Sequence, residues 1–224
     1  GYSDITAIHL AFARYAGFPT FHGLMASSLA GSVDSFSREA WLACLTGDQA
    51  LGELHYPPAK SARPAAEASL TLAGQAMVDE PVGPRALVTG RTTGVLMGGN
   101  LSLVAALTGT PYALEPEGKI LFLEDVNEEP YRVDRMLTQL KLAGVFERCE
   151  GVVLGSWTHC EPEDPQRSLT LLQVFTDIIA PAGKPVLMDF PAGHCLPTLS
   201  LPLGVEAVLD ADAGTLTITE SATA

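Results

Sequence analysis

The chain has 224 residues, with 26 acidic and 13 basic side chains and a formal net charge of −13. This length allows one large domain or two small ones. The acidic charge disfavours a general nucleic-acid-binding role, because it repels phosphate. Apolar residues make up 47% and charged residues 17%, which indicates a hydrophobic core rather than a disordered chain.

No segment approaches the roughly 20 apolar residues of a membrane span, and the sequence shows neither a signal peptide nor a basic arm. Its four cysteines lack CxxC spacing, which favours a reducing compartment. The first residues, Gly1-Tyr2-Ser3-Asp4, run directly into a helical pattern without an initiator methionine. We therefore expect the chain to be part of something longer.

The first quarter of the chain predicts two helices and one short strand. Asp4 can cap a helix, and Gly17 ends it. Residues 20–23 predict a strand and a turn, and residues 34–47 a second helix capped by Asp34 or Ser35. The apolar residues that recur at helical spacing in the first helix are Ile5, Ile8, Phe12 and Tyr15.

Residues 52–85 differ in composition, because prolines interrupt short apolar runs. This stretch is the candidate linker between two domains, with one strand near residues 69–72. Beyond it, apolar strands alternate with helices, a pattern typical of an α/β fold. The predicted strands span 91–97, 119–124, 151–156 and 184–190, the helices 101–108, 131–144 and 168–179, and a two-stranded hairpin 205–219.

Ser3 is the first candidate for chemistry. It lies before a predicted helix, where a sharp turn would expose its hydroxyl and direct helix N-terminal N–H groups at a substrate. The competing interpretation is a simple helix cap by Ser3 or Asp4, since both residue types dominate that position. The pattern also lacks the second glycine of G-x-S-x-G, because Ile5 stands there.

Glu124 and His194 each follow a predicted buried strand. Ligands of α/β folds bind at the carboxyl ends of strands, which favours a role for Glu124. The alternative is a solvated loop acid, like Glu128 and Glu129 nearby. His194 lies in a strand-end loop beside glycine, where an imidazole can move protons. Its alternative is a histidine hydrogen-bonded to backbone.

Metal and nucleotide sites are disfavoured. In His159-Cys160 and His194-Cys195, adjacent side chains point to opposite faces of an extended segment, so each pair supplies one zinc ligand more easily than two. Gly98-Gly99-Asn100, predicted as a turn before a helix, could bind an anion. It lacks the pattern of a P-loop or of dinucleotide-binding proteins. We expect no metal and no cofactor.

Several segments together resemble one family. In chain order they are Gly1-Tyr2-Ser3-Asp4 with the helix after it, TFHG at 20–23, Gly99-Asn100-Leu101, LFLEDVNEEPYR at 121–132 and PAGHC at 191–195. Taken together over nearly the whole chain, they are similar to the LD-carboxypeptidases of murein recycling, serine peptidase family S66.

The resemblance implies a catalytic triad of Ser3, His194 and Glu124. His194 would take the Ser3 proton, and Glu124 would fix the imidazole tautomer. The backbone N–H of Asp4 would form half of the oxyanion hole. Arg91 or Arg132 could hold the substrate carboxylate.

The resemblance further implies a cytoplasmic homodimer that releases the terminal D-alanine of a murein tetrapeptide, with neither nucleic acid nor membrane as a partner. One alternative is a self-immunity peptidase of the same family that cleaves peptide-nucleotide antibiotics. The other is a non-catalytic binding domain or fragment. For the fold, we expect the remainder of a Rossmann-like, nucleophile-bearing lobe and a linker over residues 1–75. A C-terminal α/β lobe with a mainly parallel sheet would span residues 76–224.

Family members carry a further N-terminal stretch, with a Gly-Gly loop that offers the other oxyanion donor. If the 224 residues act alone, we expect little or no hydrolysis, because no strand before Ser3 would set its turn. D-alanine release by this chain and by an N-terminally extended version tests this expectation. Equal rates would contradict it.

Overall fold

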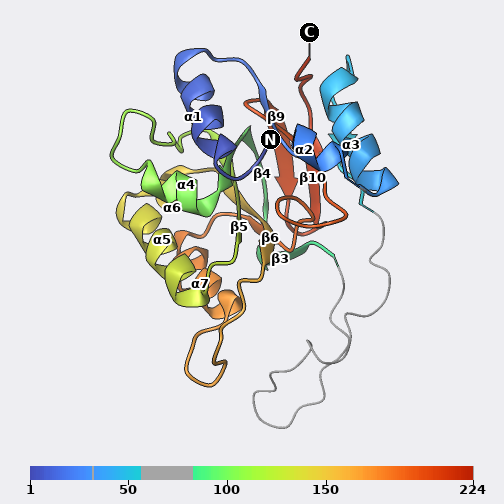
Figure 1. Cartoon of the computed structure of the whole chain (residues 1–224). Helices are drawn as coiled ribbons and strands as arrows, with labels where there is room; N and C mark the ends of the chain where they lie inside the picture. The colour runs from blue at the N-terminus through green and yellow to red at the C-terminus, as the bar shows by residue number, and fades with distance from the viewer. Residues whose placement is uncertain (32, 57–82, 224) are drawn as a thin grey trace.

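The computed structural model describes residues 1–31, 33–56 and 83–223 (Figure 1). Its helices are α1 (Ile5–Tyr15), α2 (Ala26–Leu29), α3 (Ser35–Thr46), α4 (Leu101–Ala106), α5 (Pro130–Leu142), α6 (Val145–Arg148), α7 (Leu171–Ile178) and the 3-10 turn η1 (Ala180–Ala182). Its strands are β1 (Thr20–His22), β2 (Gly52–Glu53), β3 (Arg85–Val88), β4 (Arg91–Asn100), β5 (Lys119–Val126), β6 (Gly151–Thr158), β7 (Val186–Met188), β8 (Leu201–Leu203), β9 (Glu206–Asp210) and β10 (Thr215–Ile218).

An eight-stranded sheet forms the centre of the fold, in the order β2-β10-β9-β4-β5-β6-β7-β3. The central strands β4, β5, β6 and β7 run parallel to one another. The β9–β10 hairpin and the edge strands β2 and β3 add antiparallel pairs on both sides. The predicted α/β class is confirmed, whereas a mainly parallel sheet is too narrow a description, because the sheet is mixed.

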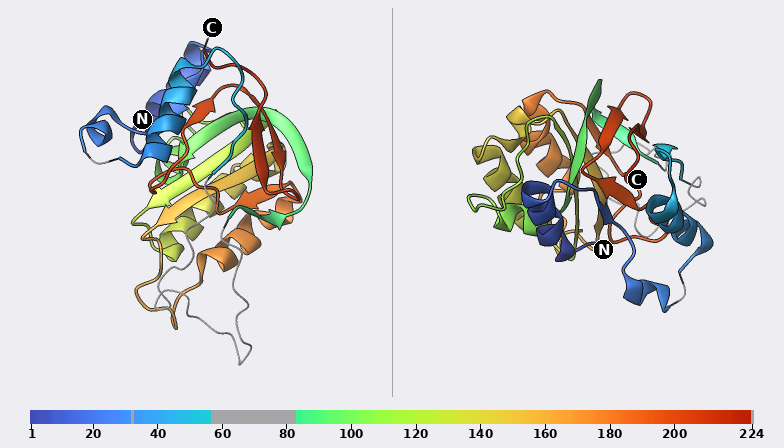
Figure 2. Two further views of the ribbon diagram at one scale, coloured as in Figure 1. Left: turned by 90° about the vertical axis from the view of Figure 1, so that its right-hand side faces the viewer. Right: turned by 90° about the horizontal axis from the view of Figure 1, so that it is seen from above.

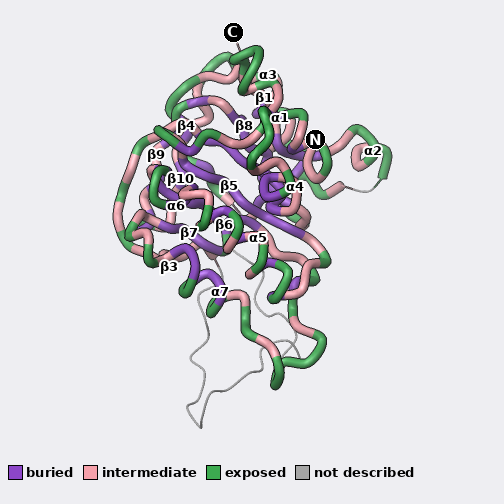
Figure 3. Tube along the Cα trace, turned by 90° about the vertical axis from the view of Figure 1, so that its left-hand side faces the viewer, coloured by how far each residue is buried: buried purple, intermediate pink, exposed green. Residues whose placement is uncertain are grey.

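Helices cover the parallel part of the sheet. Helices α4, α5, α6 and α7 lie together on one face, and α3 lies on the opposite side (Figure 2). Strand β5 is buried from Ile120 to Asp125, and the central strands form the buried interior in Figure 3. Burial on both faces explains why this strand reads as a continuous apolar run instead of an alternating one.

The first helix forms as predicted, but a different face of it is buried. Thr6, His9 and Leu10 are the buried residues of α1. The predicted apolar positions Ile8, Phe12 and Tyr15 are 41–64% exposed. The apolar periodicity therefore predicted the helix correctly but did not predict which of its side chains are buried.

The second predicted helix is confirmed together with its cap. Asp34 accepts a hydrogen bond from the backbone N–H of Ser37 at 2.9 Å. The predicted strand near 69–72 and the boundary between 75 and 76 lie outside the described residues. No helix in the described ranges is both long and apolar enough to cross a membrane.

A small second sheet links the N-terminal segment to the C-terminal part of the chain. Strand β1 pairs antiparallel with β8, and His22 stands opposite Leu201. The backbone N–H of Gly23 also donates to the carbonyl of Gly1 at 3.3 Å. The start of the chain is thus held against strand β8, whose residues are about 180 positions away in sequence.

The predicted turn at Gly98-Gly99-Asn100 is wrong. These residues continue β4 and pair with Phe122, Leu123 and Glu124 of β5. Gly98 has a φ of 139°, a conformation essentially restricted to glycine. A Cβ added there would lie 2.0 Å from the carbonyl oxygen of Phe122. Gly98 therefore permits a close approach of backbone inside the sheet, whereas Gly99 permits the close approach of the Thr6 side chain of α1.

We expect Gly98→Ala to lower the free energy of unfolding by about 3 kcal/mol or more, because it combines backbone strain with a backbone clash. Gly109→Ala is the matched control. Gly109 also has positive φ, but nothing lies within 4 Å of its added Cβ, so a cost of about 1 kcal/mol is expected. Urea denaturation followed by circular dichroism measures both. Equal losses would contradict the clash.

Candidate active site

Glu124 is fully buried at the carboxyl end of β5. It stands opposite Asn100 of β4. On the other side, the register of β5 against β6 shifts between Leu123 and Asp125. Such irregularities re-aim side chains near active sites. The structure therefore excludes the interpretation of Glu124 as a solvated loop acid.

Its neighbour Asp125 has a different part in the structure. The Asp125 carboxylate accepts hydrogen bonds from the Asn100 amide at 2.8 Å and from the backbone N–H and hydroxyl of Ser102 at 3.0 and 2.8 Å. Asn100 in turn caps α4 by accepting from the N–H of Leu103 at 3.3 Å. The start of α4, which the sequence suggested as a site for an external anion, thus binds the carboxylate of the protein's own Asp125.

His194 meets Glu124 across 70 residues of sequence. Its Nδ1 lies 2.7 Å from Oε2 of Glu124, and its backbone N–H donates to the same oxygen at 3.1 Å. A carboxylate oxygen accepts only, so Nδ1 carries a proton, and in the neutral ring Nε2 presents a lone pair. The side chain of His194 is 16% exposed, whereas that of Glu124 is fully buried. The imidazole therefore stays partly accessible to solvent, while its carboxylate partner does not.

The loop that carries His194 is tied to β6. The N–H of Ser156 donates to the carbonyl of Ala192 at 2.9 Å, and the hydroxyl of Thr158 donates to the carbonyl of His194 at 2.6 Å. Gly193 has a φ of 116°, and a Cβ there would lie 2.6 Å from Oε2 of Glu124. Only glycine allows the backbone to come this close to the carboxylate.

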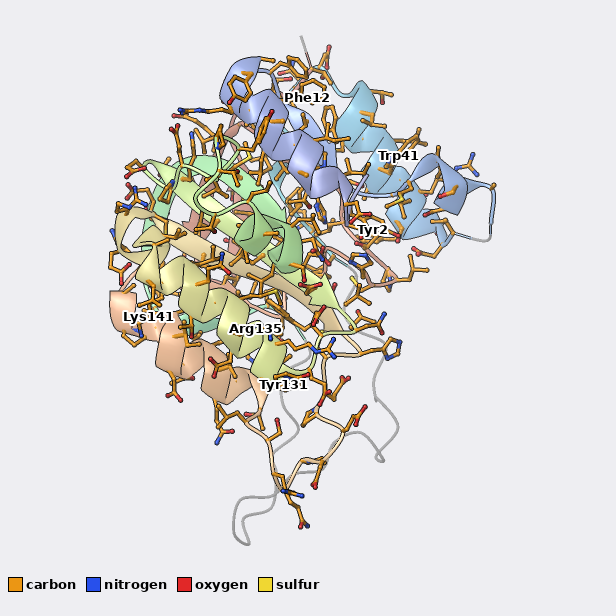
Figure 4. The ribbon with its side chains drawn as sticks, turned by 60° about the vertical axis from the view of Figure 1, so that its left-hand side comes forward. Tyr2, Phe12, Trp41, Tyr131, Arg135 and Lys141 are labelled. Carbon is orange, nitrogen blue, oxygen red and sulfur yellow. The ribbon has the colours of Figure 1, made fainter. Side chains whose placement is uncertain are left out.

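Ser3 occupies a sharp turn at the start of α1. Its φ is 61°, a left-handed conformation that is uncommon for residues other than glycine and often occurs at functional sites. The ring of the preceding Tyr2 packs edge-on against the ring of His194, with 4.6 Å between centroids. Figure 4 labels Tyr2 at the N-terminal end of α1. The Ser3 segment and the His194–Glu124 pair therefore lie side by side.

Two contacts anchor this turn. The hydroxyl of Thr6, in the first turn of α1, accepts from the N–H of Asn100 at 3.0 Å, which joins α1 to the end of β4. His9 Nε2 lies 3.0 Å from the carbonyl of Gly1. The two contacts place Ser3 near the end of β4, where Asn100 stands opposite Glu124 of β5.

The alternative of a simple helix cap is not supported. Asp4, at the cap position, makes no side-chain capping bond. Within the described ranges, neither the Ser3 hydroxyl nor the Asp4 N–H has a hydrogen-bond partner. Both groups remain available for another role.

The remaining candidates differ in position. Arg91 pairs with Asp210 at 3.8 Å, at the start of β4. Nine residues of strand, about 30 Å, separate it from Asn100 beside Glu124. Arg132 lies in the first turn of α5. It contacts Glu128 at 3.6 Å and the hydroxyl of Tyr131 at 2.9 Å. Only Arg132 is at the same end of the sheet as Glu124.

Thiol and metal chemistry find little support. Burial raises the pKa of the Cys195 thiol, so it stays protonated beside His194 and is a poor nucleophile. Among the residues that the structure describes, no group of three or more His, Cys, Asp or Glu side chains is arranged to hold a metal ion. The pairs His159-Cys160 and His194-Cys195, which the sequence already disfavoured as zinc sites, belong to no such group among these residues.

Sequence reasoning missed His22. Its side chain is fully buried, and its Nε2 lies 4.0 Å from Oε1 of Glu124. Burial, together with the nearby His9 and His194, lowers the pKa of His22 well below its usual value, so the ring is neutral near pH 7. Its place on a short strand paired with a distant one gave no local signal of this contact.

Comparison with known proteins identifies the fold and the family of sequences. Residues 93–209 match the family model described as LD-carboxypeptidase C-terminal domain. The chain is 36% identical to the "Probable murein peptide carboxypeptidase" of Bacillus subtilis, over 94% of this chain and 59% of that protein. It is 33% identical to the murein tetrapeptide carboxypeptidase of Pseudomonas aeruginosa, over 94% of this chain and 62% of that protein.

A solved structure of the microcin C7 self-immunity protein MccF has the same fold. It superposes with a TM-score of 0.81 at 26% identity, over 100% of this chain and 67% of that one. The chain spans about 60% of the length of the curated relatives named above.

The adjacent carboxylates give a test of the site. We expect Asp125→Asn to lower the free energy of unfolding by about 2–3 kcal/mol, because it weakens several charge-assisted hydrogen bonds to α4. Glu124→Gln keeps an acceptor for His194 and should cost about 1 kcal/mol. Urea denaturation measures both variants. A cost for Glu124→Gln as large as that for Asp125→Asn would indicate that Glu124 is chiefly structural.

Proposed function

The chain belongs to the LD-carboxypeptidase family, and from that premise we propose that it carries the machinery of a serine carboxypeptidase. The observation that carries the proposal is the 2.7 Å contact between His194 Nδ1 and the buried Glu124, with the strained Ser3 turn packed beside it through Tyr2. In this proposal Ser3 is the nucleophile, His194 the general base and Glu124 the acid that orients the base.

The chemistry follows from the hydrogen bonds of the pair. Because Nδ1–H of His194 donates to Glu124, Nε2 is free to take the proton as the Ser3 hydroxyl attacks the scissile carbonyl. The carboxylate then stabilises the imidazolium that forms. The proton passes from Nε2 to the leaving amine, which departs as the terminal amino acid. Water, activated by the same nitrogen, hydrolyses the acyl-serine.

In this proposal the backbone N–H of Asp4 is one of the two donors of the oxyanion hole. It follows the nucleophile directly at a helix start, where N–H groups lack partners within the helix and the helix dipole favours negative charge. The developing oxyanion would accept from this N–H. The second donor is assigned to no residue of this chain.

The proposed substrate is a murein tetrapeptide that loses its terminal D-alanine. Both relatives reported above by sequence are named for murein peptides and align with 94% of this chain. The fold of the self-immunity protein, matched at a TM-score of 0.81, favours peptide-nucleotide antibiotics as the second candidate. A cytoplasmic homodimer stays part of the proposal.

The decisive variant is Ser3→Ala, which we expect to abolish D-alanine release from murein tetrapeptide without loss of folding. It is assayed in the 224-residue chain and in N-terminally extended versions. Because the wild-type serine should be activated by His194, a fluorophosphonate probe should label Ser3 in the wild type and leave Ser3→Ala unlabelled. Retained turnover by Ser3→Ala would exclude Ser3 as the nucleophile.

The same assay separates the two candidate substrates. A murein tetrapeptide and a peptide-nucleotide conjugate are supplied in parallel at equal concentrations. We expect a higher kcat/KM for the murein peptide, and the reverse order would favour the self-immunity function. Tight binding of murein peptide without turnover in an extended chain would favour a non-catalytic domain.

A further inference from the structure

The triad accounts for one oxygen of Glu124 and leaves the other unpaired. Both hydrogen bonds from His194 end on Oε2. Within the described residues, Oε1 is buried without a hydrogen-bond partner. An unsatisfied, buried carboxylate oxygen is costly, so this atom calls for a donor.

His22 is the side chain aimed at that oxygen. Its Nε2 lies 4.0 Å from Oε1 of Glu124. Both of its ring nitrogens are buried, and in the described part of the chain neither has a hydrogen-bond partner. Two unpartnered polar groups therefore face each other in the interior. The gap is about 1 Å longer than a direct N–H···O bond, so the two groups must approach by about that distance for the bond to form.

The position of His22 is fixed by packing. Strand β1 holds its backbone opposite Leu201 of β8. The ring of Phe122, two residues before Glu124 on β5, packs against the imidazole edge-on with 4.9 Å between centroids. A ring held in this way can restrict the orientation of the carboxylate next to it.

We propose that His22 is a positioning residue of the active site: its Nε2–H donates to Oε1 of Glu124 and holds the carboxylate in the plane that His194 requires. This inference rests on the proposed function for its effect on rate. The proposed hydrogen bond between His22 and Glu124 can be tested in the folded chain whether or not the chain is an enzyme. His22 touches no reacting atom and acts only through Glu124.

The charge state of His22 suits this role. A neutral imidazole carries one N–H and one lone pair. With a carboxylate oxygen on the Nε2 side, the proton belongs on Nε2. A neutral donor orients Glu124 without competing for its negative charge, which stays available to the imidazolium of His194.

The first test measures the tautomer of His22 in the unsubstituted protein and uses a variant only to assign the signals. In a ¹⁵N-histidine-labelled chain, nitrogen chemical shifts report the tautomer of each ring, and His22→Gln assigns the His22 signals. We expect the Nε2–H tautomer for His22 at pH 7. The Nδ1–H tautomer would overturn the proposal.

The second test uses a matched pair of variants. His22→Phe keeps a ring of similar size and removes both nitrogens, whereas His22→Gln places an amide N–H₂ close to the position of Nε2. The readout is the downfield Nδ1–H proton resonance of His194. We expect it to shift upfield in His22→Phe and to stay near its wild-type position in His22→Gln. No change in His22→Phe would contradict the role.

Kinetics give the third readout, in whichever version of the chain is active. We expect kcat to fall about 10- to 100-fold in His22→Phe, with KM almost unchanged. This loss is a part of the roughly 10²–10⁴-fold rate increase that general base catalysis contributes. His22→Gln should recover most of the loss. Equal losses in both variants would indicate packing alone and overturn the proposal. The exposed His55, changed to Phe and Gln, is the control.

Failure of this inference is distinguishable from failure of the proposed function. If Ser3→Ala retains turnover, the nucleophile assignment is wrong, while the tautomer of His22 and the His194 resonance still decide the contact. If Ser3→Ala is inactive but His22→Phe behaves as the wild type in both readouts, only the positioning role is lost.

Discussion

The proposed active site depends on a carboxylate that is buried and must therefore be paired. Glu124 has no exposed surface, and an ionised carboxyl group in the interior is stable only with strong donors around it. His194 supplies two, from its ring and from its backbone, to a single oxygen. This pairing fixes the tautomer of His194 and so determines which nitrogen can accept a proton. In the proposed function, the burial of Glu124 and the role of His194 as base are linked through this one contact.

The fold brings the residues of the proposed site together from four parts of the chain. Strand β5 carries Glu124, and the loop tied to β6 carries His194. The turn at the start of α1 carries Ser3, anchored by the Thr6 contact to β4. Strand β1, paired with β8, carries His22. Parallel strands end at the same edge of the sheet, which is why ligands of α/β folds bind there. The neighbouring Asp125 holds this edge in place by fixing the start of α4.

Much of the architecture could be predicted from local patterns. The apolar runs at Lys119–Glu124 and Gly151–Ser156 identified two buried strands, and Asp34 identified a helix cap, because these signals depend on nearby residues only. Glu124 and His194 could be singled out for the same reason, since each follows a strand. The family resemblance then connected them with Ser3. Their contact with each other is a fact of tertiary structure.

The errors arose where distant segments decide the local conformation. Gly98 and Gly99 have the composition of a turn, yet pairing with β5 keeps them extended. The apolar stripe of the first helix did not reveal which face is buried, because burial depends on what packs against the helix. Arg91 is at the far end of its strand from Glu124, which sequence distance does not show. His22 was overlooked because its significance lies in a contact with a residue about 100 positions away.

The central claim is that Ser3, His194 and Glu124 form one proton-transfer unit. The most direct measurement is a crystal structure of the chain, N-terminally extended if the extension proves necessary for labelling, after reaction with a fluorophosphonate. The account predicts phosphorus bonded to Ser3 Oγ, with Nε2 of His194 within about 3.2 Å of that oxygen and Nδ1 still on Glu124. An adduct on another residue, or an imidazole turned away from Ser3 while Glu124 remains in place, would contradict it.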